Sequence, residues 1–176
     1  MKTLVFLAAI LTSLAVAQAQ NFTVRMDAAQ DGGGTRMGSG SGTLTLNATL
    51  DTLSFNNITF SGLSAPSTAG HIHGPAPAGV STGVLYTLGG PFFTLGTTSG
   101  SINGTLQLVA GPGGFDLPTQ ITQLESSLWY INIHDSVFPG GEIRGQILPV
   151  PEPSALPLLG IGVCGLWLSL RRHRSR

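Results

Sequence analysis

The chain has 176 residues, of which 8 are Lys or Arg and 8 are Asp or Glu, so its formal net charge is zero. This length allows one domain of ordinary size with terminal segments. The charges are unevenly distributed, because residues 20–154 contain three Arg, no Lys and all eight acidic residues, whereas four Arg crowd the last six positions. A central region with so few cations cannot neutralise a run of phosphates, so we do not expect nucleic acid to be a partner.

The N-terminus has the pattern of a secretory signal peptide. A lysine at the second position precedes the apolar run Leu4–Val16, and residues 17–19 (Ala-Gln-Ala) supply the small side chains that a signal peptidase accepts. We therefore predict that residues 1–19 form a signal peptide that is cut before Gln20. An uncleaved anchor helix is the alternative, which the short apolar run disfavours.

The central region, residues 20–149, has the pattern of a β domain. It is rich in Gly, Thr, Ser and Asn, and it lacks a long segment with apolar residues every 3.6 positions. Short alternating runs between Gly, Pro and Asn clusters predict antiparallel strands. The predicted strands are Phe22–Asp27, Gly42–Leu50, Thr52–Phe60, Ala69–His73, Gly83–Leu88, Gly100–Leu108, Leu128–His134 and Glu142–Leu148. Residues 119–127 can form one or two helical turns. We expect an all-β fold, an antiparallel Greek-key-like sandwich or barrel.

The segment His71-Ile72-His73 is the first candidate for chemistry. Successive side chains of a strand point to opposite faces, so His71 and His73 share one face while Ile72 points into the core. Two imidazoles at this spacing can chelate one transition-metal ion, copper or zinc.

A second candidate lies near the end of the domain. In residues 129–134 (WYINIH), alternation directs Trp and Ile inward and places His134 on the polar face. The turn at residues 138–141 (FPGG) predicts a hairpin, which would bring His134 close to Glu142. On the following strand, Glu142 and Arg144 would share a face.

These residues suggest one site, although the order of the strands cannot be read from the sequence. His71, His73 and His134 would form a mononuclear metal site with an open position, and Glu142 would be a fourth ligand or a hydrogen-bond partner of a ligand. The alternative is that the histidines bond to loops and that Glu142 pairs with Arg144 or another neighbour.

The same segments carry a family resemblance. Residues 70–75 (GHIHGP), followed by residues 129–147 (WYINIHD…PGGEIRGQI), resemble the CHRD domain, a module first described in chordin and widespread in secreted bacterial proteins. The resemblance extends over residues 21–148. It implies a β-rich extracellular domain, and in bacteria the family is mostly of undetermined function. The role of chordin as a growth-factor antagonist does not transfer to bacterial partners.

The C-terminus combines three features. Pro151, Glu152 and Pro153 come first, the apolar stretch 155–170 follows, and residues 171–176 are rich in Arg. A helix of sixteen residues spans roughly 24 Å, which is shorter than the ~30 Å hydrocarbon core unless its flanks snorkel. Under the positive-inside rule the Arg cluster would stay cytoplasmic, leaving the central domain outside. A plain tail anchor is one interpretation.

In this order, the three features also resemble the PEP-CTERM sorting signal of Gram-negative bacteria that produce exopolysaccharide. The resemblance covers residues 150–176. It implies that an exosortase-type membrane protease recognises the triplet and removes the tail. The protein would then be anchored transiently in the inner membrane before transfer to the cell surface or the extracellular space.

No sequence pattern points to an enzyme. The chain has no Gly-x-Ser-x-Gly elbow, no His-Glu-x-x-His and no cysteine in the central region. Copper/zinc superoxide dismutases need four copper histidines and a separate zinc set, so three histidines do not predict that activity. We expect a non-catalytic cell-surface or extracellular-matrix module that contacts polysaccharide or copies of itself. The alternative function is binding of copper or zinc through the histidines.

Overall fold

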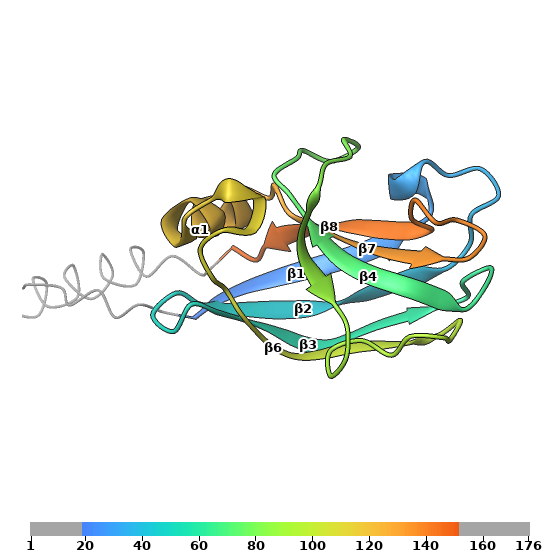
Figure 1. Ribbon diagram of the computed structural model, residues 1–176, viewed down its shortest axis with the longest axis horizontal. Coiled ribbons are helices and arrows are strands. Elements are labelled where there is room, and N and C mark those ends of the chain that lie inside the picture. Colours follow the sequence, from blue (N-terminus) through green and yellow to red (C-terminus); the bar gives the residue numbers. More distant parts are fainter. Residues whose placement is uncertain (1–18, 152–176) are drawn as a thin grey trace, which may run out of the picture.

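The computed structural model describes residues 19–151, which form a β barrel with one helix at its end (Figure 1). The elements are β1 Gln20–Asp27, η1 Ala29–Asp31, β2 Ser39–Asn47, β3 Thr52–Ser61, β4 Ser67–His73, β5 Val84–Leu88, β6 Gly100–Gln107, η2 Pro112–Gly114, α1 Leu117–Glu125, β7 Tyr130–Asp135 and β8 Ile143–Pro149. The expected signal peptide and the sorting tail after Pro151 lie outside the described residues. Within residues 19–151, no helix combines the length and hydropathy that a membrane crossing requires.

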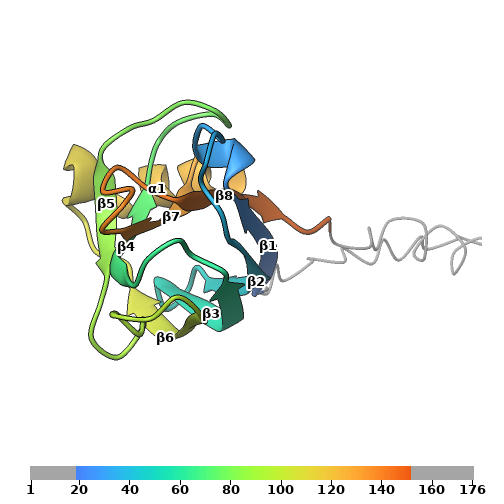
Figure 2. The same cartoon turned by 90° about the vertical axis from the view of Figure 1, so that its right-hand side faces the viewer.

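The eight strands form one antiparallel sheet in the order β5-β4-β7-β8-β1-β2-β3-β6. Figure 2 shows these strands following one another round a ring. Near the open edge, Phe93 pairs with Ile102 of β6 in an isolated bridge, and Asn103 N donates to Phe92 O at 2.9 Å. The segment after β5 therefore nearly closes the ring. The expected all-β fold is confirmed, as one barrel-like sheet.

The interior of the barrel holds the inward-facing apolar side chains of all eight strands. The largest fully buried side chains of the described residues, among which Tyr130 lies on the outer face, are Trp129, Tyr130, Phe22, Met26, Leu44, Leu46, Leu53, Ile58, Ile72, Leu88, Ile102 and Leu108. All of these except Tyr130 belong to one continuous core cluster. Burial of this much apolar surface is the main favourable term in folding, and it takes the place of a disulfide in the described domain.

Helix α1 covers one end of the barrel (Figure 1). Its Leu124 is fully buried, and the side chain of Gln123 accepts a hydrogen bond from the indole N–H of Trp129 at 3.2 Å. The helix begins two residues before the expected helical turns, because Asp116 caps it by accepting from Thr119 N at 2.9 Å.

Strand β2 begins at Ser39, three residues before the expected start. Glycines are poor strand formers, but Gly40 and Gly42 are needed here because they face the core. A Cβ at Gly40 would lie 2.5 Å from Met26 Cε, and a Cβ at Gly42 would lie 2.5 Å from Ile58 Cα. Tertiary packing therefore overrides the local preference.

The same strand ends at Asn47, three residues before the expected end at Leu50. The Asn47 side chain accepts hydrogen bonds from Thr49 N at 3.1 Å and from Leu50 N at 3.2 Å, which closes a turn. Asp51 follows with a φ of 50°, and Leu50 is 62% exposed. The alternation of apolar residues continues into this turn, but it does not mark a strand there.

The outer face of β7 is polar, as the alternation predicts, but it is covered, because every residue of β7 is buried. Two loops lie over it, residues 74–83 between β4 and β5 and residues 28–38 between β1 and β2, on the upper side in Figures 1 and 2. Arg144 of β8 contacts both loops, since it donates to Ser81 Oγ at 3.2 Å and to Gln30 O. We call the covered outer-face side chains the polar layer; they are His71, His73, Tyr130, Asn132, His134, Arg144 and Gln146.

Candidate metal centre

The three histidines that the sequence singles out lie together in the polar layer. Strands β4 and β7 are hydrogen-bonded neighbours, with Ala69 opposite His134 and His71 opposite Asn132. This register places His71, His73 and His134 on the same outer face. Each of them offers a ring nitrogen, and these nitrogens all lie within 4.8 Å of one another.

Backbone carbonyls orient two of the rings. His73 Nδ1 lies 2.9 Å from Thr82 O, and His134 Nδ1 lies 3.0 Å from Pro139 O. A carbonyl only accepts, so both Nδ1 atoms carry the proton and both Nε2 atoms keep a free lone pair. This is the arrangement in which a histidine binds metal, with its other nitrogen held by a backbone carbonyl.

The lone pairs turn toward the same small space. His71 Nδ1 lies 3.0 Å from His134 Nε2, which identifies His71 as the donor and the His134 nitrogen as the acceptor. His73 Nε2 is buried and has no hydrogen-bond partner. A metal ion can replace the hydrogen bond between His71 and His134 and can satisfy the His73 nitrogen at the same time.

The spacing is compatible with binding after small ring movements. Nitrogen ligands lie at about 2.0–2.1 Å from zinc, so two nitrogens in a tetrahedral site are roughly 3.3 Å apart. The three nitrogens already lie within 4.8 Å. Small rotations of the rings would bring these nitrogens to the separation of roughly 3.3 Å that a common ion requires.

The electrostatic surroundings favour the neutral, metal-binding form. Burial lowers the pKa of His71 below its ordinary value, and the neighbouring His134 and His73 lower it further. Burial also lowers the pKa of His73, although the hydrogen bond to Thr82 opposes this effect. Neither ring has to lose a proton to bind a metal at neutral pH.

Glu142 does not join the histidines. Its fully buried carboxylate accepts hydrogen bonds from Ser64 N at 2.8 Å, Ser64 Oγ at 2.6 Å and Met37 N at 3.0 Å. The alternative pairing of Glu142 with Arg144 is also absent from residues 19–151, and β8 begins one residue later than expected, at Ile143. Glu142 is thus an acceptor that ties two loops to the barrel, and it is absent from the group of potential metal ligands around the histidines.

Asp135 shares this loop-holding role. Its carboxylate accepts from Ala65 N, Val137 N and Phe138 N. Burial alone would raise the pKa of Asp135, but the hydrogen bonds that its carboxylate accepts from the backbone outweigh burial and lower it. Together the two carboxylates fix the loops at this end of β7.

The partner of Arg144 is Asp31 of η1, a residue that the sequence did not single out. Arg144 Nε lies 3.6 Å from Asp31 Oδ1, and the guanidinium lies 4.9 Å from the centre of the Tyr130 ring. Tyr130 in turn stacks on His73, with ring centres 5.0 Å apart. Burial raises the pKa of Asp31, whereas Arg144 and Arg36 act in the opposite direction. Asp31 lies in a Gly-rich loop far along the chain, so no local pattern could identify it.

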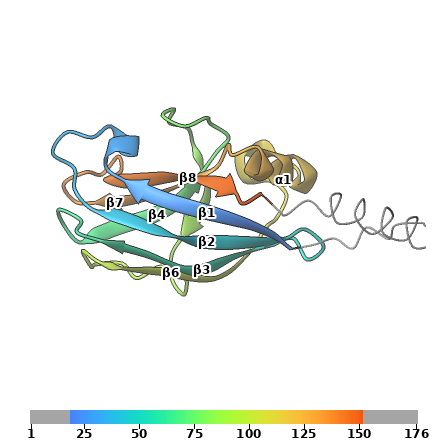
Figure 3. The same ribbon diagram turned by 180° about the vertical axis from the view of Figure 1, so that it is seen from behind.

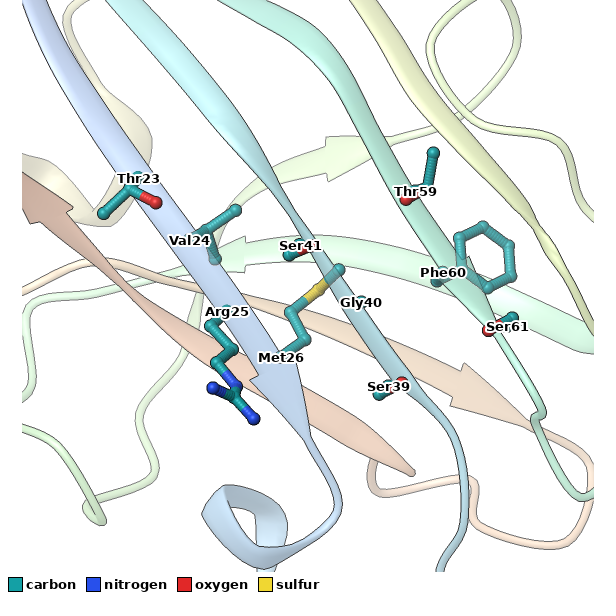
Figure 4. Close-up of a pocket in the computed structure, with 10 residues that line it drawn as sticks. All are labelled: Thr23, Val24, Arg25, Met26, Ser39, Gly40, Ser41, Thr59, Phe60 and Ser61. Carbon is teal, nitrogen blue, oxygen red and sulfur yellow. The ribbon is translucent and has the colours of Figure 1, made fainter.

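A separate feature lies on the outer face of β1, β2 and β3, the strands seen from behind in Figure 3. A trough of about 620 Å³ runs across these strands (Figure 4). Hydroxyl side chains from all three strands line it, and Arg25 is its charged residue; the polar lining is Thr23, Arg25, Ser39, Ser41, Thr59 and Ser61. None of the three histidines lines this trough.

Comparison with known proteins gives two matches. The model of the CHRD domain matches residues 22–147, and the model of the PEP-CTERM protein-sorting motif matches residues 149–174. No curated protein and no solved structure matches the chain. Both resemblances seen in the sequence are confirmed. The sorting motif, which includes Pro151, Glu152 and Pro153, indicates export, sorting to the cell surface and recognition by an exosortase.

Proposed function

The chain belongs to the CHRD-domain family and carries a PEP-CTERM sorting motif, and we propose that it is a non-catalytic surface protein that binds one transition-metal ion, copper or zinc. The ligands are His71, His73 and His134. Metal binding at the cell surface suits retention of an ion or stabilisation of the domain.

The observation that supports this proposal best is the buried and unpartnered Nε2 of His73. A buried polar atom without a partner costs about 1–3 kcal/mol. This nitrogen lies beside two other ring nitrogens, and the carbonyls of Thr82 and Pro139 orient two of the three rings. A metal ion would supply the missing partner.

Metal titration of the full chain, purified in detergent, tests the proposal. We expect the wild type to bind one equivalent of Cu²⁺ or Zn²⁺ and the His71→Ala/His73→Ala variant to bind none. His173→Ala, in the Arg-rich tail, is the matched control and should bind as the wild type does. Binding by the wild type no greater than that of a denatured sample would refute the metal site.

Contact with polysaccharide is a second candidate function, which the hydroxyl-lined trough favours. Serine and threonine hydroxyls both donate and accept, so they can match the hydroxyl groups of sugar rings, and Arg25 can bind an acidic sugar. We expect Arg25→Ala/Thr59→Val to reduce recovery of the chain on immobilised exopolysaccharide. The His71→Ala/His73→Ala variant should be retained as well as the wild type. Equal retention of all three proteins would argue against the trough.

A further inference from the structure

The ligand set of the candidate metal centre carries no negative charge. Among residues 19–151, the group of side chains that could hold one ion consists of His71, His73 and His134. Imidazole nitrogens bind a metal in their neutral form. A divalent ion held by these three ligands therefore keeps both of its positive charges.

The carboxylates around the polar layer are engaged elsewhere. Asp31 Oδ1 lies 3.6 Å from Arg144 Nε, so a cation already offsets its charge. Glu142 accepts hydrogen bonds from Ser64, and Asp135 accepts from three backbone N–H groups of the loops. None of the three carboxylates belongs to the group of potential ligands. A bound ion is left without an anionic partner in a layer that is largely removed from water, and such a charge is costly unless it is paired.

Three ligands also leave one coordination position open. A zinc ion is almost always four-coordinate, and a site with three protein ligands takes its fourth ligand from solution. The Thr82 and Pro139 carbonyls accept hydrogen bonds from the histidine rings, so they hold ligands in place. The fourth ligand therefore has to reach the ion from the solvent.

The cluster is open to solvent on the side of β5. His73 and His134 are each 8% exposed, and Asn132 beside them is 4% exposed, whereas His71 is only partly buried. In the pairing of β4 with β5, His71 lies opposite Thr87, which is exposed. Directly opposite residues of an antiparallel pair point to the same face. The approach to the ion thus lies between His71 and Thr87.

We propose that the metal centre binds a small monovalent anion as its fourth ligand, and that this anion enters between His71 and Thr87. This inference rests on the proposed function and adds the class of ligand that the site takes from solution. One anion would lower the uncompensated charge of the ion by half, and the Thr87 hydroxyl can donate a hydrogen bond to it. The anion has to be small because two loops cover the rest of the polar layer.

Azide titration of the full chain in detergent, loaded with one equivalent of Cu²⁺, tests the inference. Azide bound to Cu²⁺ gives a charge-transfer absorption band, which we expect to saturate at one azide per ion. Thr87→Phe, which places a larger side chain beside the opening, should weaken azide binding at least tenfold and change Cu²⁺ affinity less than threefold. Thr87→Val removes only the hydroxyl and should also weaken azide binding, with Cu²⁺ affinity unchanged.

Thr43→Phe, at an exposed position on the outer face of β2, is the matched control and should change azide binding less than threefold. If the wild type binds Cu²⁺ and azide produces no band, the inference fails although the histidine site stands. Azide binding of wild-type strength in both Thr87 variants would place the opening elsewhere and would also overturn the inference. If the wild type binds no Cu²⁺, the proposed function is wrong and this inference fails with it.

Discussion

Burial favours the neutral form of His71 and His73, and this makes the stability of the folded protein depend on pH. Burial lowers the pKa of both rings in the folded protein below the ordinary value of 6.5. Below about pH 6.5 the unfolded chain therefore binds protons that the folded chain does not. The free energy of unfolding should be greatest above this pH, and it should decrease as the pH falls from 6.5 toward the lowered pKa values.

We predict this slope for the metal-free protein, measured by urea unfolding at several pH values between 7.5 and 5. His71→Gln should show a shallower decrease, because it removes one of the two groups that take up a proton on unfolding. His173→Gln, outside the domain, should behave as the wild type does. Stability that is independent of pH in the wild type over this range would contradict the prediction.

Gly141 is the residue on which the geometry of the polar layer depends most directly. Its φ is 128°, a conformation that other residues rarely adopt, and an added Cβ would meet Asp31 Oδ2 and Asn132 Nδ2 at 2.1 and 2.4 Å. Both oxygen-bearing side chains would have to move.

Gly141→Ala should therefore lower the free energy of unfolding by about 1–3 kcal/mol, through backbone strain and the clash together. Gly140→Ala is the matched control, since a Cβ there meets no atom within 4 Å. It should change stability by less than about 0.5 kcal/mol. Equal urea midpoints for the two variants would show that the turn adapts without cost.

At the scale of elements, α1 depends on its cap and on two buried glutamines. Asp116 accepts from Thr119 N, while Gln120 and Gln123 bond to Tyr86 and Trp129 of the barrel. The helix is short, so its stability comes mainly from this packing and capping.

We predict that Asp116→Ala lowers the free energy of unfolding by about 1 kcal/mol, the usual cost of removing an N-cap side chain. Thr119→Ala keeps the N–H group that Asp116 caps and removes only the exposed Thr119 hydroxyl, which also bonds to the Asp116 carboxylate, so it should cost less than Asp116→Ala. Thermal unfolding followed by far-UV circular dichroism compares the two. A larger loss in Thr119→Ala would assign the stabilisation to the Thr119 side chain.

The register between β4 and β7 decides whether the histidines meet. His71 lies opposite Asn132 and Ala69 lies opposite His134, which places all three histidines on one face. A shift of one residue would turn Ile72 outward and the histidines inward. Because Ile72, Ile131 and Ile133 are fully buried, the hydrophobic core enforces the register that forms the cluster.

At the scale of the whole molecule, the domain and its sorting motif follow each other directly. Strand β8 ends at Pro149, and the matched motif begins at the same residue. The recognition triplet therefore starts two residues after the last strand, and its removal would leave the barrel complete.

We predict that protein recovered from cells lacks the residues beyond about Ser154, including the Arg-rich tip, as mass spectrometry of its C-terminal peptide would show. Replacing Pro151 and Glu152 by alanine should leave the tail attached, because the exosortase would no longer recognise the motif. Pro157→Ala lies outside the triplet and should be processed normally. An intact tail on the wild-type protein would mean that it acts as a plain membrane anchor.

The sequence by itself determined the local features of this protein. Alternation of apolar and polar residues predicted the strands, including the shared face of His71 and His73, because the side-chain direction in a strand depends only on position. The FPGG turn predicted the hairpin of β7 and β8, which the strand pairing confirms. The motifs at residues 70–75 and 129–147, together with the C-terminal tail, were sufficient to identify the family and to predict sorting to the cell surface.

Only the tertiary structure decided what surrounds the histidines. The choice of a barrel, the burial of the outer face of β7 and the partners of Glu142 all depend on loops that contact strands far away in the chain. Ser64 holds Glu142, and η1 brings Asp31 to Arg144, across more than 70 residues in each case. Alternation reports which side of a strand is apolar, but it carries no information about which loop will cover the other side.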